Sequence, residues 1–273
     1  MIAGMAEAPP QPPAPTPAPI VLRAPPAAGE PVLEGDFSLS ILGEAVAFHV
    51  EVPDGPTTLE ALLPVFQGLS NEMARRAAAK VVAEGETISC RAGCGACCRQ
   101  PVPVAEAEAR DIAAMVDAMP EPRRAEIRAR FAAAERRLVE AALAGRLVDL
   151  PDGKTVVNVG ANYFALGIPC PFLEAESCSI HPDRPLGCRE YLVSSPAAAC
   201  ATLDPKAIKR APLAGTPSRA LYDAGAQNTP EGWLLLTQAL SFAERHPEPT
   251  PARPAPEWIG AIVGRLAAAS RGA

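Results

Sequence analysis

The cysteines of this chain limit its fold more than any other feature of the sequence. There are eight among 273 residues, and all of them lie within residues 90–200. They stand at positions 90, 94, 97, 98, 170, 178, 188 and 200. The first 31 residues have neither a basic leader nor an apolar run of the length that a secretory signal needs. We therefore expect a cytoplasmic protein, in which clustered cysteines indicate metal or redox chemistry more often than disulfides.

The overall composition narrows the class of protein. Hydrophobic residues make up 48% and charged residues 21%, which is ordinary globular usage and excludes disorder throughout the chain. The net charge is -6, without a dense run of Lys and Arg. No window is long and apolar enough to span a bilayer. Neither nucleic acid nor a membrane is expected as a partner.

The pattern along the chain predicts a mainly α fold, with helices packed around an irregular cysteine-rich metal-binding core and a small N-terminal β-hairpin. Four regions are expected: a disordered Pro/Ala-rich arm over 1–35, a hairpin and helix over 36–88, a cysteine-cluster metal-binding domain over 89–200, and a C-terminal helical region with a Pro-rich connector over 201–273.

Apolar and polar residues alternate around Gly43 over residues 37–52, which predicts the hairpin. Thr57 and Glu60 form a capping-box pattern ahead of a helix from Thr58 to Ala83. Two further helices are expected over 104–119 and 121–145, separated by Pro120 and Pro122 and ended by Gly145.

Residues 150–200 lack a sustained period and predict short turns and loops. A short helix is expected near Ser218–Ala224. Another is expected to open at Thr229 and to carry Trp233 through Phe242, because proline after a threonine cap is a typical helix start. The final helix has an apolar stripe that we interpret as core packing, formed by Trp258, Ile259, Ile262, Val263 and Leu266.

The first cysteine group is CRAGCGACC, with a Cys-x-x-Cys unit at Cys94 and Cys97. Such a unit lets a turn bring two thiolates onto one metal, and Gly93 and Gly95 free the backbone to wrap the sulfur atoms. Neighbouring side chains diverge, so one of Cys97 and Cys98 can ligate while the other serves a second metal, a cluster edge or redox chemistry.

The second group is CPFLEAESCSIHPDRPLGC, followed twelve positions later by Cys200. Neither group alone has the spacing of a zinc finger or a ferredoxin. We therefore expect both groups to converge on one composite site, with the helices between Cys98 and Cys170 folding back as a hairpin.

Together the two motifs, CRAGCGACC and CPFLEAESCSIHPDRPLGCREY, resemble the CxxCxxCC or YkgJ family, which is described as putative zinc- or iron-chelating proteins. The resemblance covers Ser89 to Ser194. The first cysteine of the family pattern falls at Arg91, and Cys90 is the expected replacement. His181 stands where the family usually has tyrosine, so it is not expected to ligate. The implied metal ligands are Cys90, Cys94, Cys97, Cys98, Cys170, Cys178 and Cys188, with Cys200 as the weakest candidate.

Several functions stay open at this point. The metal is zinc or iron, including an iron–sulfur cluster, and the surplus of thiols favours iron. Excess thiolate charge could be offset by Arg91, Arg99, Arg184 and Arg189, or these could be ordinary surface and ion-pair residues.

Two alternatives do not require a chelated metal as the main function. The resemblance extends to flagellin lysine-N-methylase, which implies methyl transfer from S-adenosylmethionine, although no glycine-rich loop follows a predicted strand. A metal-free thiol redox sensor would use Cys97 and Cys98. No catalytic residue is predicted, because the chain lacks the motifs of hydrolases and NTPases.

Overall fold

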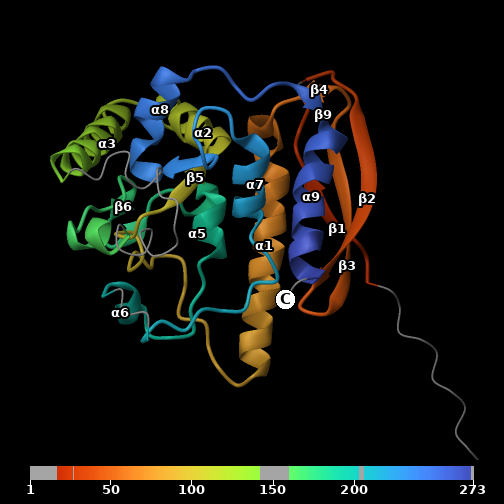
Figure 1. The fold of residues 1–273 in the computed structure, drawn as a ribbon, viewed down its shortest axis with the longest axis horizontal. Coiled ribbons are helices and arrows are strands. Elements are labelled where there is room, and N and C mark those ends of the chain that lie inside the picture. Colours follow the sequence, from red (N-terminus) through yellow and green to blue (C-terminus); the bar gives the residue numbers. More distant parts are fainter. Residues whose placement is uncertain (1–16, 27, 142–159, 203–205, 272–273) are drawn as a thin grey trace, which may run out of the picture.

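The computed structural model describes residues 17–26, 28–141, 160–202 and 206–271. Its central element is α1 (Leu59–Ala83), which runs through the middle of the molecule (Figure 1). The predicted helix is confirmed, but its cap is Thr58, whose hydroxyl accepts the N–H of Ala61 at 3.4 Å. Glu60 does not complete a capping box, since its carboxylate binds Thr250 and Arg110.

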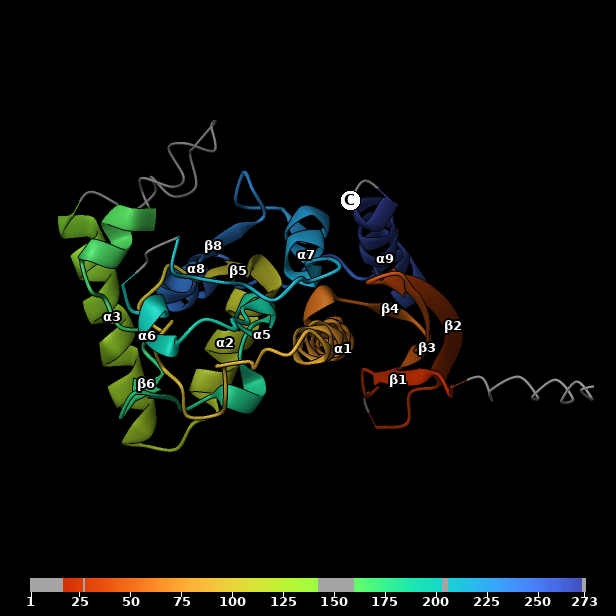
Figure 2. The same cartoon turned by 90° about the horizontal axis from the view of Figure 1, so that it is seen from below.

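A three-stranded sheet lies beside α1, with β3 (Glu44–Pro53) between β1 (Ile20–Arg23) and β2 (Val32–Ile41). β2 and β3 form the predicted hairpin, closed by Leu42 and Gly43 at φ of 53° and 88°. β1 adds to β3 in parallel. Helices α1 and α9 (Ala255–Arg271) cover the same face of the curved sheet (Figures 1 and 2).

β1 and the start of β2 lie where the sequence predicted a disordered arm. Leu22 is 3% exposed and packs against α1 at Gly68, where an added Cβ would lie only 2.8 Å from the Leu22 side chain. Because Gly68 has no side chain, the strand can pack closely against α1 at this point. The Ala/Pro-rich sequence around the strand is the reason that it was not predicted. Residues 1–16 and 27 of the predicted arm lie outside the described residues.

On the other side of α1 lie α2 (Glu106–Asp117) and α3 (Arg123–Glu140), which confirm the two helices predicted around Pro120 and Pro122. The predicted stop at Gly145 lies outside the described residues. The described part of 150–200 forms short elements as predicted. They include a helix over residues 160–165, β6 (Leu173–Glu174), β7 (Ser177–Cys178), a 3₁₀ turn (His181–Asp183), α5 (Leu186–Glu190) and α6 (Ala197–Cys200).

The C-terminal region confirms the helices near 218 and 258 but corrects the one between them. α7 spans Pro217–Gly225, and the apolar stripe of α9 is buried in the core as predicted. The helix expected from Thr229 is wrong: Trp233–Leu235 is strand β8, which pairs with β5 (Pro103–Ala105). The helix here, α8, begins only at Ala239 and ends at Arg245.

The contacts of Thr229 explain why the helix predicted to start there does not form. Its N–H and hydroxyl donate to the Glu106 carboxylate at 2.8 and 2.9 Å, and Gly232 has φ of 68°, outside the helical region.

The last pair of short strands, β4 (Pro56–Thr57) and β9 (Arg253–Pro254), joins the start of α1 to the start of α9. The mainly α class is confirmed, whereas packing around a metal is not shown by the fold. None of the helices in the described ranges combines the length and the apolar character needed to cross a membrane.

Candidate metal centre

The first cysteine segment leaves α1 and folds into successive tight turns. The N–H of Cys94 donates to the carbonyl of Arg91 at 3.1 Å, and that of Cys98 donates to Gly95 at 2.9 Å. Gly93 has φ of 86°, a conformation that favours glycine. These turns wrap the backbone around the Cys-x-x-Cys unit, as its two glycines predicted.

The second segment lies directly against the first. The Cys170 N–H donates to the Cys98 carbonyl at 2.7 Å. A Cβ added to Gly95 would lie 2.5 Å from the carbonyl oxygen of Glu176, in the turn between β6 and β7. The two cysteine groups, more than seventy residues apart at Cys98 and Cys170, therefore meet through their backbones.

Cys97 lies at the centre of the cluster of cysteine side chains. Its pKa is raised, first by a hydrogen bond with the Cys98 thiol and then by burial. Burial likewise raises the pKa of Cys170 to about 12 and that of Cys188 well above its ordinary value, and the charge that Cys97 would carry raises both further. Cys178 is half-buried, and its pKa is raised mainly by burial. Without a cation, these thiols hold their protons near neutral pH.

Cys90 and Cys200 lie on the α6 side of the same group. The Cys90 sulfur accepts the Val193 N–H at 3.4 Å. Burial raises the pKa of both thiols, and each is raised further by Cys94 and Cys97. Cys200 is only 3% exposed. The structure thus brings the weakest sequence candidate to the other thiols, a position that no spacing rule indicated, since short helix α6 and the bend after Val193 create it.

The four arginines named from the sequence have different surroundings. Arg184 lowers the pKa of Cys97 and Cys178, so its charge acts on the thiols. Arg99 pairs with Glu176 at 2.6 Å, which ties the first segment to the second. Arg189 is buried and donates to the carbonyls of Pro182 and Arg184, which indicates a structural role. Arg91 is exposed.

The donor chemistry fits zinc or iron, because thiolates suit both metals. The Arg184 Nε is buried and makes no hydrogen bond to the described residues, which leaves a donor beside the thiols. Still, within the described part of the chain no three His, Cys, Asp or Glu side chains are grouped tightly enough to hold an ion.

Comparison with known families places this segment. Residues 89–204 match the CxxCxxCC family, described as a putative zinc- or iron-chelating domain. The match confirms the resemblance, extends past Ser194 to include Cys200, and covers less than half of the chain. Neither the curated proteins nor the solved structures gave a match.

Proposed function

We propose that the CxxCxxCC domain binds zinc or iron through one composite thiol site. The ligands come from Cys90, Cys94, Cys97, Cys98, Cys170, Cys178 and Cys188, and we add Cys200 as an eighth thiol. The observation that carries the proposal is the backbone contact between Cys98 and Cys170, since it joins two groups that are each incomplete alone.

Burial of the thiols supports a cation as the missing component. A buried thiolate without a positive partner is unfavourable, and Arg184 is one positive charge among many thiols. A bound metal would stabilise the thiolates, as a closed structural tie if zinc and as a redox centre if an iron–sulfur cluster. The surplus of thiols over the four that zinc needs favours iron.

The free state of the cysteines supports a reducing compartment. All eight are unpaired in the structure, although two segments rich in cysteine lie in contact. We therefore propose that the protein works in the cytoplasm. A metal-free redox sensor is less well supported, because it needs a thiolate of low pKa and the pKa of Cys97 is raised. The methylase alternative rests only on the resemblance.

The deciding experiment measures iron, zinc and acid-labile sulfide, with a visible absorption spectrum, on protein purified without oxygen or added metal. Iron with sulfide and a brown colour identifies a cluster, whereas zinc without colour identifies a structural site. The double variant Cys94→Ser/Cys97→Ser is expected to lose the metal.

The control is Ser179→Ala, which removes a 3.0 Å hydrogen bond to the Phe172 carbonyl in the same loop but no thiol. This variant is expected to keep its metal. Unchanged metal in the double cysteine variant, or absence of metal from the wild-type protein after anaerobic reconstitution with either ion, would rule the proposal out.

A further inference from the structure

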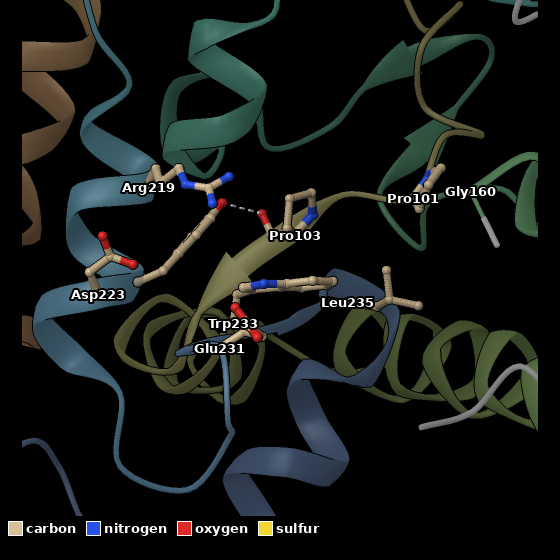
Figure 3. Close-up of a pocket in the computed structure, with 9 residues that line it drawn as sticks. Pro101, Pro103, Gly160, Arg219, Asp223, Glu231, Trp233 and Leu235 are labelled. Carbon is tan, nitrogen blue, oxygen red and sulfur yellow. Dashed lines mark hydrogen bonds between the residues drawn. The ribbon is translucent and has the colours of Figure 1, made fainter. Parts of the chain in front are cut away.

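Two adjoining cavities lie beside the cluster of cysteine side chains. The larger, about 460 Å³, has Cys97 and Cys188 in its wall. The smaller, about 280 Å³, is shown in Figure 3. They share four lining residues: Pro101, Pro103, Arg219 and Tyr222. Cavities of this size accommodate small organic molecules.

The larger cavity is lined by arginines that lack acidic partners. Most other arginines in the described ranges form ion pairs, such as Arg76 with Glu72 at 2.7 Å. Arg210 instead stacks on Tyr191, with its guanidinium 4.8 Å from the ring centre. Arg219 is exposed, and although its backbone N–H donates to Thr216, its guanidinium makes no hydrogen bond or ion pair to any described residue. In a chain with a net charge of -6, two such cations on one cavity indicate an anionic ligand.

The acidic residue in the wall of the larger cavity does not neutralise these arginines. Glu190 is 8% exposed. One carboxylate oxygen accepts the Ser70 hydroxyl at 3.0 Å and the Ser218 N–H at 2.9 Å, and the other accepts the Ser218 hydroxyl at 2.5 Å. Its oxygens are therefore satisfied by neutral donors within the fold, and no ion pair joins it to Arg210 or Arg219 in the described residues.

The smaller cavity has a flat apolar wall at its far end. In Figure 3 the Trp233 indole lies below Pro103, with Leu235 beside it, and Arg219 lies on the opposite side of Pro103. The Tyr222 hydroxyl donates to the Pro103 carbonyl at 3.0 Å, which fixes the ring between the two cavities. Asp223 and Glu231 also line this end and would repel an anion there.

We propose that these cavities bind one small organic molecule with an oxyanion head and an apolar or aromatic body. Arg210 and Arg219 hold the head, a carboxylate or phosphate, in the cavity that opens on Cys97 and Cys188. The body lies against Trp233, away from the arginines. Binding through the arginines does not depend on the proposed metal.

The test measures binding of 3-phenylpropionate and phenyl phosphate, with uncharged 3-phenylpropan-1-ol as the matched probe. Quenching of Trp233 fluorescence is the readout, because the other tryptophan, Trp258, is 2% exposed. At least one anion is expected to bind about tenfold more tightly than the alcohol, and Arg210→Gln and Arg219→Gln are each expected to lose about tenfold in affinity.

The control variant is Arg136→Gln, which removes an exposed arginine of α3 outside both cavities. It is expected to bind like the wild type. Equal binding of anion and alcohol, binding of neither anion, or an equal loss in Arg136→Gln would overturn the inference. Metal content is measured on each variant and is expected to stay unchanged, so a failed anion site and a failed metal site give different results.

Discussion

At the scale of single residues, a buried carboxylate holds two parts of the segment 89–204 together. Glu108 is 3% exposed, and its two oxygens accept the N–H groups of Ala105 at 2.8 Å and Leu186 at 2.7 Å. The Leu186 contact fixes the start of α5, the helix that carries Cys188. Glu108 thereby links α2 to one of the proposed ligands.

Burial raises the pKa of Glu108 from 4.5 to about 7. Between these values the unfolded chain releases a proton that the folded protein retains, so stability falls as pH rises through this window. The shift corresponds to on the order of 3 kcal/mol. We expect Glu108→Gln to flatten this slope and to be less stable at pH 5, because one amide oxygen cannot accept both N–H groups. Urea unfolding across pH 4.5–7 measures both effects.

The control is Glu248→Gln, which changes an exposed carboxylate. It should retain the wild-type slope. An unchanged slope in Glu108→Gln would mean that Glu108 does not hold its proton in the folded protein.

Gly95 gives a second prediction at this scale. The sequence indicated it as a flexible position in a turn, but the structure shows a close approach, with an added Cβ only 2.5 Å from the Glu176 carbonyl and the Leu173 side chain. Because Glu176 and Leu173 precede Cys178 in the same loop, Gly95→Ala should push the two cysteine segments apart. We expect a loss of bound metal and about 1–3 kcal/mol of stability, measured by metal analysis and urea unfolding.

Gly264→Ala is the matched change, since nothing lies within 4 Å of its added Cβ in α9. It should keep its metal and gain up to about 1 kcal/mol in helix stability. Equal metal content in both glycine variants would show that the segments need not touch at Gly95.

At the scale of elements, the sequence predicted best where a hydrophobic helical period continues over many residues, as in α1, α2, α3 and α9. The sequence-based prediction failed at β8. There, the pairing with β5 and the hydrogen bond from Thr229 to the buried Glu106 carboxylate outweigh the local helix-start pattern at Thr229. For the same reason the family resemblance implied seven cysteine ligands but left Cys200 as the weakest candidate. Its closeness to the other thiols depends on the whole fold.

Arg110 connects three helices and gives the clearest test at this scale. It is 8% exposed, donates to Glu60 of α1 at 3.0 Å, lies 3.6 Å from Glu106 of α2, and donates to the His246 carbonyl after α8 at 3.0 Å. Arg110→Ala leaves two carboxylates without their cation. We expect a loss of about 3 kcal/mol in the free energy of unfolding.

Arg124→Ala provides the comparison, since its ion pair with Glu121 at 2.8 Å is exposed and lies within one turn of the chain. Its loss should stay within about 0.5 kcal/mol. Similar losses in the two variants would show that the Arg110 contacts do not couple the helices.

At the scale of the whole molecule, residues 89–204, which match the CxxCxxCC family, share their core with the segments before and after them. β5 pairs with β8 outside the matched range, and Val104, Ile112 and Phe131 pack in one cluster with Leu234, Leu240 and Phe242. On the other side, Leu186 is fully buried in the cluster that contains α1 and α9. Residues 89–204 therefore lack partners for much of their own apolar surface when separated.

We expect a fragment of residues 89–204 to remain without fixed tertiary structure even when zinc or iron is supplied, because thiol ligation cannot replace the buried contacts of α1, β8 and α8. Near-ultraviolet circular dichroism and hydrogen exchange test this, with the full chain as the control. Adding residues 205–273 back should restore β8 and part of the protection in α2, whereas full protection should also need α1. A cooperative unfolding transition in the fragment would instead show that the metal alone organises the domain.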